Sequence, residues 1–583
     1  MSLAKSNRPA VESVDALARR VASGTRISIG GHHFARLPIA LLRAIAKSGV
    51  RDLNYFAWAG GLPLELLLEV GVVGSIDICF SSLDIFGLAP RFREVAENRR
   101  LPIRDWPALA MIQGLRAAQQ NLPFMPVQLP EGSTMMERCP ALTRHRDART
   151  GREIGLVEAQ VIDTLLLHAP RADTDGNVEI YGAKALDVGQ AGAARQVLVT
   201  VEEIVPAGTL RQNGRNTILT RNLITAIAEA PGGAYPTSCL PYYATDYARI
   251  RDILEGKHGS LIEALSGSKP SQLLRRAAKI SAAKIVPEPF RDGSAQPSHP
   301  RVDEIMAVRI ARMLDDESFA SAGAVSPLAN VAYRLAKATH APGLFLGVFS
   351  CGHVDVQPGT MTLTLLEAMD ASSAVSHSGG DEAYSTYYQA GIVTHEIIGA
   401  AQIDSRGRTN NLELVKPSGG RLRLPGQGGM SDVANMHRNY VVYVSRHSRM
   451  ALVDSVETVS SARGLITASE RARTGYRPGD VFLITNLCLF RFDEAEGQLV
   501  VTETMPGVKR ETIMAETGFK VIFAGDCREM DPPTAQELKV LREEIDPLGI
   551  RRLEFVGAKD RGALLDEILR RDLEGTAHII GEV

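Results

Sequence analysis

The chain has 583 residues, of which 45% are hydrophobic and 23% are charged, a composition typical of globular proteins. This length exceeds what one hydrophobic core supports, so we expect two or more domains. The 65 Lys and Arg residues nearly balance the 67 Asp and Glu residues. That balance gives no reason to propose nucleic acid or an anionic membrane as a partner.

The six cysteines have no paired spacing, so they indicate neither a disulfide framework nor a metal site. Residues 1–9 lack the apolar core of a signal segment. No uninterrupted apolar stretch is long enough to span a bilayer. The cytoplasm is therefore the expected location.

The first elements alternate between helix and strand. The pattern predicts a helix over 11–22, then a strand over 26–33 that enters a glycine turn. A second helix over 37–47 begins beside Pro38, and an apolar strand over 53–59 follows. This order is typical of an α/β domain with parallel strands.

A proline-rich segment separates the two halves of the chain. Residues 286–300 hold four prolines and no hydrophobic periodicity, so we predict a linker there between domains at 1–285 and 301–583. After it, a predicted helix over 326–337 resembles the helix over 37–47, since both begin near a proline and end in Ala-Lys. The two halves therefore look like a diverged duplication with a shared cleft.

The second half contains a strand end suited to chemistry. An apolar run over 344–349 is the right length for a buried strand and stops at Ser350, Cys351 and Gly352. A nucleophile followed by glycine beyond a strand end can meet a substrate, because ligands bind at such ends. The alternative interpretation is a plain turn of small residues around a buried cysteine.

Two glycine-containing segments follow. Gly399 and Gln402 come at the end of a strand, and a glycine turn contains Gly426, Gln427, Gly428 and Gly429. Exposed backbone N–H groups in such turns can stabilise an oxyanion. The alternative is a loop whose glycines only serve backbone conformations with positive φ.

Taken together, these segments resemble the family I CoA-transferases, closest to the glutaconate CoA-transferase branch. The first half resembles the α subunit and the second half the β subunit, fused in one chain, through motifs at 30–31, 86–93, 114–118, 122–126, 172–177, 201–206, 237–239, 340–342, 399–404, 426–429, 517–519 and 542–547. The resemblance implies an α/β fold with two similar open-sheet domains of the NagB/RpiA/CoA-transferase type. It also implies an acyl-CoA between the halves, with coenzyme A as part of the substrate and no tightly bound cofactor. A homo-oligomer stays open.

The chain departs from this family at the catalytic glutamate, which lies in a Glu-Ser-Gly or Glu-Asn-Gly motif. Aligning the motif's glycine with Gly352 places Ser350 at the glutamate and Cys351 beside it. A shift of one residue would place Phe349 there. The oxyanion glutamine of the oxo-acid branch aligns with Ala108. The nearest carboxylates in the sequence are Asp355, Glu367, Asp381 and Glu382.

This departure favours chemistry other than CoA transfer. A transferase glutamate forms an acyl anhydride and then a glutamyl-CoA thioester. A cysteine can accept an acyl group, but it has no carbonyl with which to bind CoA. We therefore expect hydrolysis, C–C cleavage or decarboxylation of an acyl-CoA. A true transferase with another carboxylate is the first alternative, and an acyl-CoA-binding protein without catalysis is the second.

Two side chains are candidates for supporting roles. If Cys351 is a nucleophile, its pKa must be lowered by nearby positive charge or N–H groups, and His353 is close enough in sequence to help. Asp105 lies where related hydrolases carry an acidic residue, which makes it a secondary acid/base candidate. A solvated loop aspartate is the alternative interpretation of Asp105.

Overall fold

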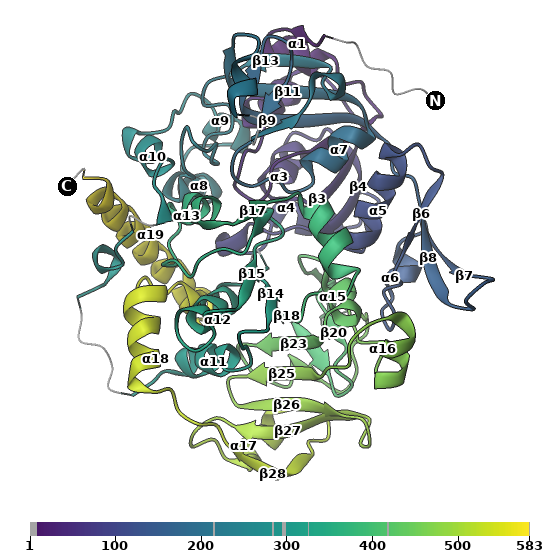
Figure 1. Cartoon of the computed structure of the whole chain (residues 1–583), viewed down its shortest axis with the longest axis vertical. Helices are drawn as coiled ribbons and strands as arrows, with labels where there is room; N and C mark the ends of the chain where they lie inside the picture. Colours follow the sequence, from purple (N-terminus) through teal and green to yellow (C-terminus); the bar gives the residue numbers. More distant parts are fainter. Residues whose placement is uncertain are drawn as a thin grey trace.

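The computed structural model describes residues 8–213, 216–282, 285–293, 299–323, 326–416 and 419–581. Its strands form two large sheets, one from each half of the chain, which lie one above the other in Figure 1. The predicted linker at 286–300 lies between the last strand of the first sheet and the first strand of the second. Its residues 294–298 lie outside the described residues. The domain limits themselves stay a prediction.

The first sheet is an open, parallel sheet, as the helix–strand alternation predicts. Its main path is β1 (Ala10–Val11), β13 (Ala226–Glu229), β11 (Ala194–Val205), β9 (Ile162–Asp173), β2 (Arg26–Ile29), β3 (Leu53–Ala59), β4 (Val73–Phe80) and β5 (Ile103–Asp105). Every pairing along this path is parallel. Such strands read as apolar runs because helices cover both faces of a parallel sheet.

The second sheet is parallel at one end and mixed at the other. Its path is β15 (Phe345–Gly347), β14 (Phe319–Ser321), β18 (His395–Gly399), β23 (Asn439–Val444), β25 (Val481–Thr485), β26 (Cys488–Asp493), β27 (Gln498–Thr504) and β28 (Phe523–Glu529). The pairings from β15 to β25 are parallel, whereas β26 is antiparallel to both neighbours. Two open α/β sheets confirm the predicted fold class.

The two proline-started helices occur where the sequence predicts them. Helix α2 (Ile39–Lys47) begins directly after Pro38, and α12 (Pro327–Ala338) has its proline at the first turn. Proline suits this position because the first helical N–H groups have no partner within the helix. Each helix buries its apolar side, and α12 is buried along most of its length.

The C-terminal region differs from the prediction. The helix expected over 532–546 as the last one is α18 (Ala535–Val540) followed by a π-helical turn, and the chain continues into α19 (Ala558–Ile580). Helix α19 packs against α8 (Tyr247–Leu254) and α10 (Gln272–Ala277) of the first half (Figure 1). No described helix, α19 included, is long and apolar enough to cross a membrane.

Candidate functional site

Two adjoining cavities lie between the halves of the chain. The large cavity has a volume of about 480 Å³ and the small cavity about 180 Å³. Both have walls from both halves, and they share His32, His33, Gly323 and Gly399. A cleft between domains is a common place for a ligand site, and the strand end predicted to carry chemistry opens onto this one.

The turn after β15 directs neighbouring side chains into different cavities. Ser350 lines the small cavity and Cys351 lines the large one. The turn is held by a hydrogen bond from the Val348 N–H to the His353 carbonyl, at 2.8 Å. Gly352 has φ +83°, and a Cβ there would lie 1.9 Å from the Ser378 carbonyl oxygen, so only glycine fits. Gly352 itself is not among the lining residues.

Cys351 does not have the electrostatic surroundings of a thiolate. Burial, together with the nearby Glu367 carboxylate, raises the pKa of Cys351 to about 12. Burial also lowers the pKa of His353 to about 3, and its Nδ1 lies 3.2 Å from the His377 ring nitrogen. A neutral His353 cannot stabilise an anion, so the expected lowering of the Cys351 pKa is wrong.

The predicted glycine turn lines the small cavity but uses two of its N–H groups within the protein. Residues 426–429 are all in the wall of that cavity. The Gly426 N–H donates to the Asn411 carbonyl at 3.0 Å, and the Gly428 N–H donates to the Cys79 carbonyl at 3.1 Å. The Gln427 side chain donates to the Trp106 carbonyl. These groups join the halves and are not directed at a ligand.

Gln402 and Asp105 lie outside the cavity walls. The Gln402 amide donates to the Met450 carbonyl at 3.1 Å. Asp105 is 4% exposed, and it accepts hydrogen bonds from Arg423 at 3.1 Å and Arg138 at 3.3 Å. Burial opposes its charged form, yet the two guanidinium groups hold the pKa of Asp105 below its usual range. Asp105 therefore ties the halves together as a buried ion.

A histidine–aspartate pair in the cavity wall was missed as a site in the sequence. His33 Nδ1 lies 2.6 Å from Asp84 Oδ1, and both residues line the large cavity. With the Nδ1 proton directed at the carboxylate, Nε2 carries the lone pair, and it has no partner among the described residues. Both residues have φ +52°, a conformation that costs energy outside glycine. The glycine turn before His33 was the available signal.

The coenzyme A transferase family model matches residues 11–217 and 303–516. The chain belongs to the coenzyme A transferase family. Its two matched regions lie on either side of the predicted linker, so both parts of the family architecture occur in one chain. This result confirms the resemblance found in the sequence, and it makes the chain a member of an enzyme family that acts on acyl-CoA.

Named relatives agree with the family. Subunits A and B of glutaconate CoA-transferase from Acidaminococcus fermentans are 28% and 25% identical, over 40% and 42% of this chain and 78% and 92% of each subunit. The IpdA subunit of a cholesterol ring-cleaving hydrolase from Rhodococcus jostii is 30% identical over 40% of this chain and 82% of that subunit. An acyl-CoA transferase (YdiF) from Escherichia coli O157:H7, solved as a thioester complex with CoA, shares the fold, with a TM-score of 0.65, 15% identity, and coverage of 90% and 96%.

Only one of the four alternative carboxylates of this family member lines a cavity. Glu367 is in the wall of the large cavity and accepts a hydrogen bond from the Ser238 hydroxyl. Burial raises the pKa of Glu367. Asp355 instead pairs with Lys337 at 2.5 Å. Asp381 and Glu382 are absent from the described lining of both cavities.

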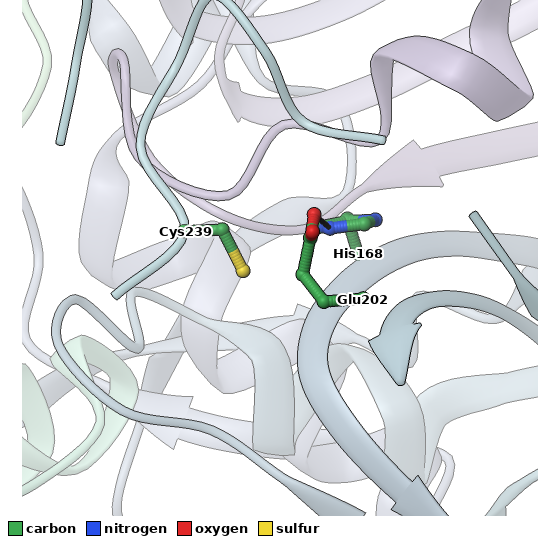
Figure 2. Close-up of side chains that lie close together, drawn as sticks. All are labelled: His168, Glu202 and Cys239. Carbon is green, nitrogen blue, oxygen red and sulfur yellow. Dashed lines mark hydrogen bonds and ion pairs between the residues drawn. The ribbon is translucent and has the colours of Figure 1, made fainter. Parts of the chain in front are cut away.

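One further group of side chains has the spacing of metal ligands. Ligand atoms of His168, Glu202 and Cys239 lie within 4.8 Å of one another, and Figure 2 shows the three converging. Both His168 nitrogens are already paired, Nδ1 with Thr200 and Nε2 with Glu202, each at 2.9 Å. Glu202 also accepts from the Tyr243 hydroxyl at 2.5 Å. This arrangement is a satisfied buried network, which ties β9 and β11 to the segment around Cys239.

Proposed function

We propose that this protein binds an acyl-CoA between its halves and processes it by hydrolysis, C–C cleavage or decarboxylation. The observation that carries this proposal is the strand end. It presents Ser350 to the small cavity and Cys351 to the large cavity, with no carboxylate at the position where the resemblance expects one. A CoA transfer cycle needs an enzyme carboxylate that becomes first an anhydride and then a CoA thioester.

The His33–Asp84 pair supplies a means of activating water. Asp84 fixes the imidazole orientation, so that Nε2 is the acceptor directed at the cavities that His33 lines. A histidine base within reach of water contributes to acyl hydrolysis without any covalent intermediate. The neutral Cys351 thiol then lines the binding site without acting as the nucleophile. Similarity to a subunit of a ring-cleaving hydrolase supports this proposal.

A CoA-transferase is the second candidate function, because Glu367 lines the same cavity as Cys351. Its carboxylate would have to replace the missing glutamate from a different segment of the chain. A protein that only binds acyl-CoA is the third candidate. It predicts no turnover of any thioester.

Incubation with an acyl-CoA in ¹⁸O-labelled water separates these functions. Hydrolysis of either bond places one labelled oxygen in the product acid, which mass spectrometry detects. Decarboxylation releases CO₂ and leaves the CoA thioester shortened by one carbon. A transferase gives no product until an acceptor acid is added, and it forms an intact-protein CoA adduct that Glu367→Gln would abolish. Acceptor-dependent turnover with that adduct would overturn the proposal.

A further inference from the structure

The small cavity contains polar groups that neither the family resemblance nor the proposed function uses. Trp58 and His32 are 5% and 4% exposed, and their rings stack with centroids 5.1 Å apart. Trp58 Nε1 and His32 Nε2 are buried, and neither has a hydrogen-bond partner among the described residues. Unpaired buried donors and acceptors are costly, so such groups in a cavity wall indicate a polar ligand.

Glu396 faces the same cavity from the second half of the chain. It lies on β18, is 7% exposed, and accepts a 2.5 Å hydrogen bond from the Tyr388 hydroxyl. Tyr388 in turn is bonded to Ser321. A Cβ placed on Gly323, a residue shared by both cavities, would lie 3.8 Å from Glu396 Oε1. Tyr388 thus holds one carboxyl oxygen while the other faces the junction of the cavities.

We propose that the small cavity is the acyl subsite, that Glu396 is its proton donor, and that the subsite takes acyl groups without a terminal carboxylate. This inference rests on the hydrolytic function proposed above and adds the acid that must accompany the His33 base. Glu396 reaches the ligand through the open side of its carboxyl. Its partner Tyr388 is a positioning residue.

The proton balance requires both groups. The oxygen of water bonds to the carbonyl carbon, and one water proton moves to His33 Nε2. The bond from that carbon to the leaving atom then breaks. The leaving atom, the CoA sulfur or the α carbon, keeps the electron pair and takes the proton of the neutral Glu396 carboxyl. His33 afterwards releases a proton to solvent and Glu396 regains one, so no other reactant is needed.

The surroundings of Glu396 favour this role. Burial raises the pKa of Glu396 to about 7, although Tyr388 and Ser321 act to lower it. The groups that face it are Tyr388, Tyr384, Tyr333, and the two histidines across the cavity. The pKa of each of these tyrosines is raised well above its usual value, so none of them is anionic near neutrality.

The charge of the small cavity explains the exclusion of acidic acyl groups. Its described lining contains no Lys or Arg, and Glu396 is the only carboxylic side chain in it. A ligand carboxylate would meet no cation there and would be close to a second acid. Burying an unpaired charge is strongly unfavourable. An uncharged acyl chain instead matches the aromatic wall, and its carbonyl oxygen is within the polar groups Trp58 and His32.

Kinetics of Glu396→Gln test the proton donor. We expect kcat to fall about 10²- to 10⁴-fold while KM changes little. Wild-type activity should decline as pH rises through about 7, because Glu396 then loses the proton it donates. Tyr388→Phe removes a donor that favours the ionised form, so this decline should move to higher pH. Asp432→Asn is the control, since burial also raises the pKa of Asp432 to about 7 and it lines neither cavity.

Binding of two matched thioesters tests the selectivity without requiring turnover. Pentanoyl-CoA and glutaryl-CoA differ by the terminal carboxylate, and we expect the wild type to bind pentanoyl-CoA at least tenfold more tightly. Glu396→Gln should reduce this preference. Labelled water entering the wild-type product together with full activity and an unchanged pH profile in Glu396→Gln would overturn this inference alone. Equal binding of the two thioesters would overturn the selectivity, whereas no turnover by the wild type overturns the proposed function.

Discussion

Ser350 and Cys351 are adjacent in the chain but line different cavities, with the serine in the small cavity and the cysteine in the large one. Their separation follows from the tight turn at Gly352, which reverses the chain beyond β15. The two residues therefore are not interchangeable as replacements for the glutamate of the family. The acyl subsite proposed above is on the Ser350 side.

A carboxylate placed on the Ser350 side should restore transfer chemistry. We expect Ser350→Glu to move CoA from an acyl-CoA to acetate, because its carboxylate enters the small cavity and can form an anhydride. Acetyl-CoA formation measured by chromatography checks this. Cys351→Glu is the matched variant and should give no transfer. Transfer by Cys351→Glu alone would show that the reacting thioester lies in the large cavity.

The Cys351 thiol should be unreactive. With a pKa of about 12, roughly one thiol in ten thousand is ionised at pH 8, and alkylation needs the thiolate. We expect iodoacetamide to label Cys351 far more slowly than a free cysteine, and Cys351→Ala to keep kcat within about tenfold of the wild type. Peptide mass spectrometry and steady-state kinetics measure the two effects. Fast labelling with complete loss of activity in Cys351→Ala would restore the nucleophile.

His33 and Asp84 should act as one unit. We expect His33→Gln to lower kcat by about 10²- to 10⁴-fold and Asp84→Asn to lower it by a smaller factor. The double variant should be no slower than His33→Gln, because the aspartate works only through the imidazole. Multiplying losses in the double variant would mean that Asp84 contacts the substrate independently of His33.

How much the sequence predicts differs between the fold and the site. Strand 53–59 has the bounds predicted from its apolar run, because a buried parallel strand leaves a continuous hydrophobic signal. Helix α19 carries its own signal in Leu565, Ile568 and Leu569, a spacing of three and four residues that places them on one buried face. No expectation covered it, although the pattern is present.

The site residues were harder to predict because they depend on contacts distant in sequence. Glu396 is a single acid within an apolar strand, and nothing near it in the sequence indicates Tyr388 as its partner across the fold. Asp105 shows the opposite case, since its position suggested catalysis while its surroundings are two guanidinium groups. Which cavity a side chain lines is set by the docking of the halves, and local sequence does not encode that.

The Asp105–Arg423 ion pair leads to a prediction about stability. Asp105→Asn leaves the buried Arg423 without its anionic partner, and breaking a buried pair in this way costs about 3–5 kcal/mol. The pKa of Asp105 is lowered in the folded state, so its contribution is present above the unfolded value of roughly 3.9 and is lost as pH falls through the folded pKa. The destabilisation by Asp105→Asn, measured in urea, should therefore be full at pH 7 and shrink below about pH 4. Asp175→Asn is the control, because it removes an ion pair whose Arg8 side chain is 74% exposed and should cost under about 1 kcal/mol. If Asp105→Asn instead unfolds like the wild type and loses only kcat, Asp105 takes part in the reaction.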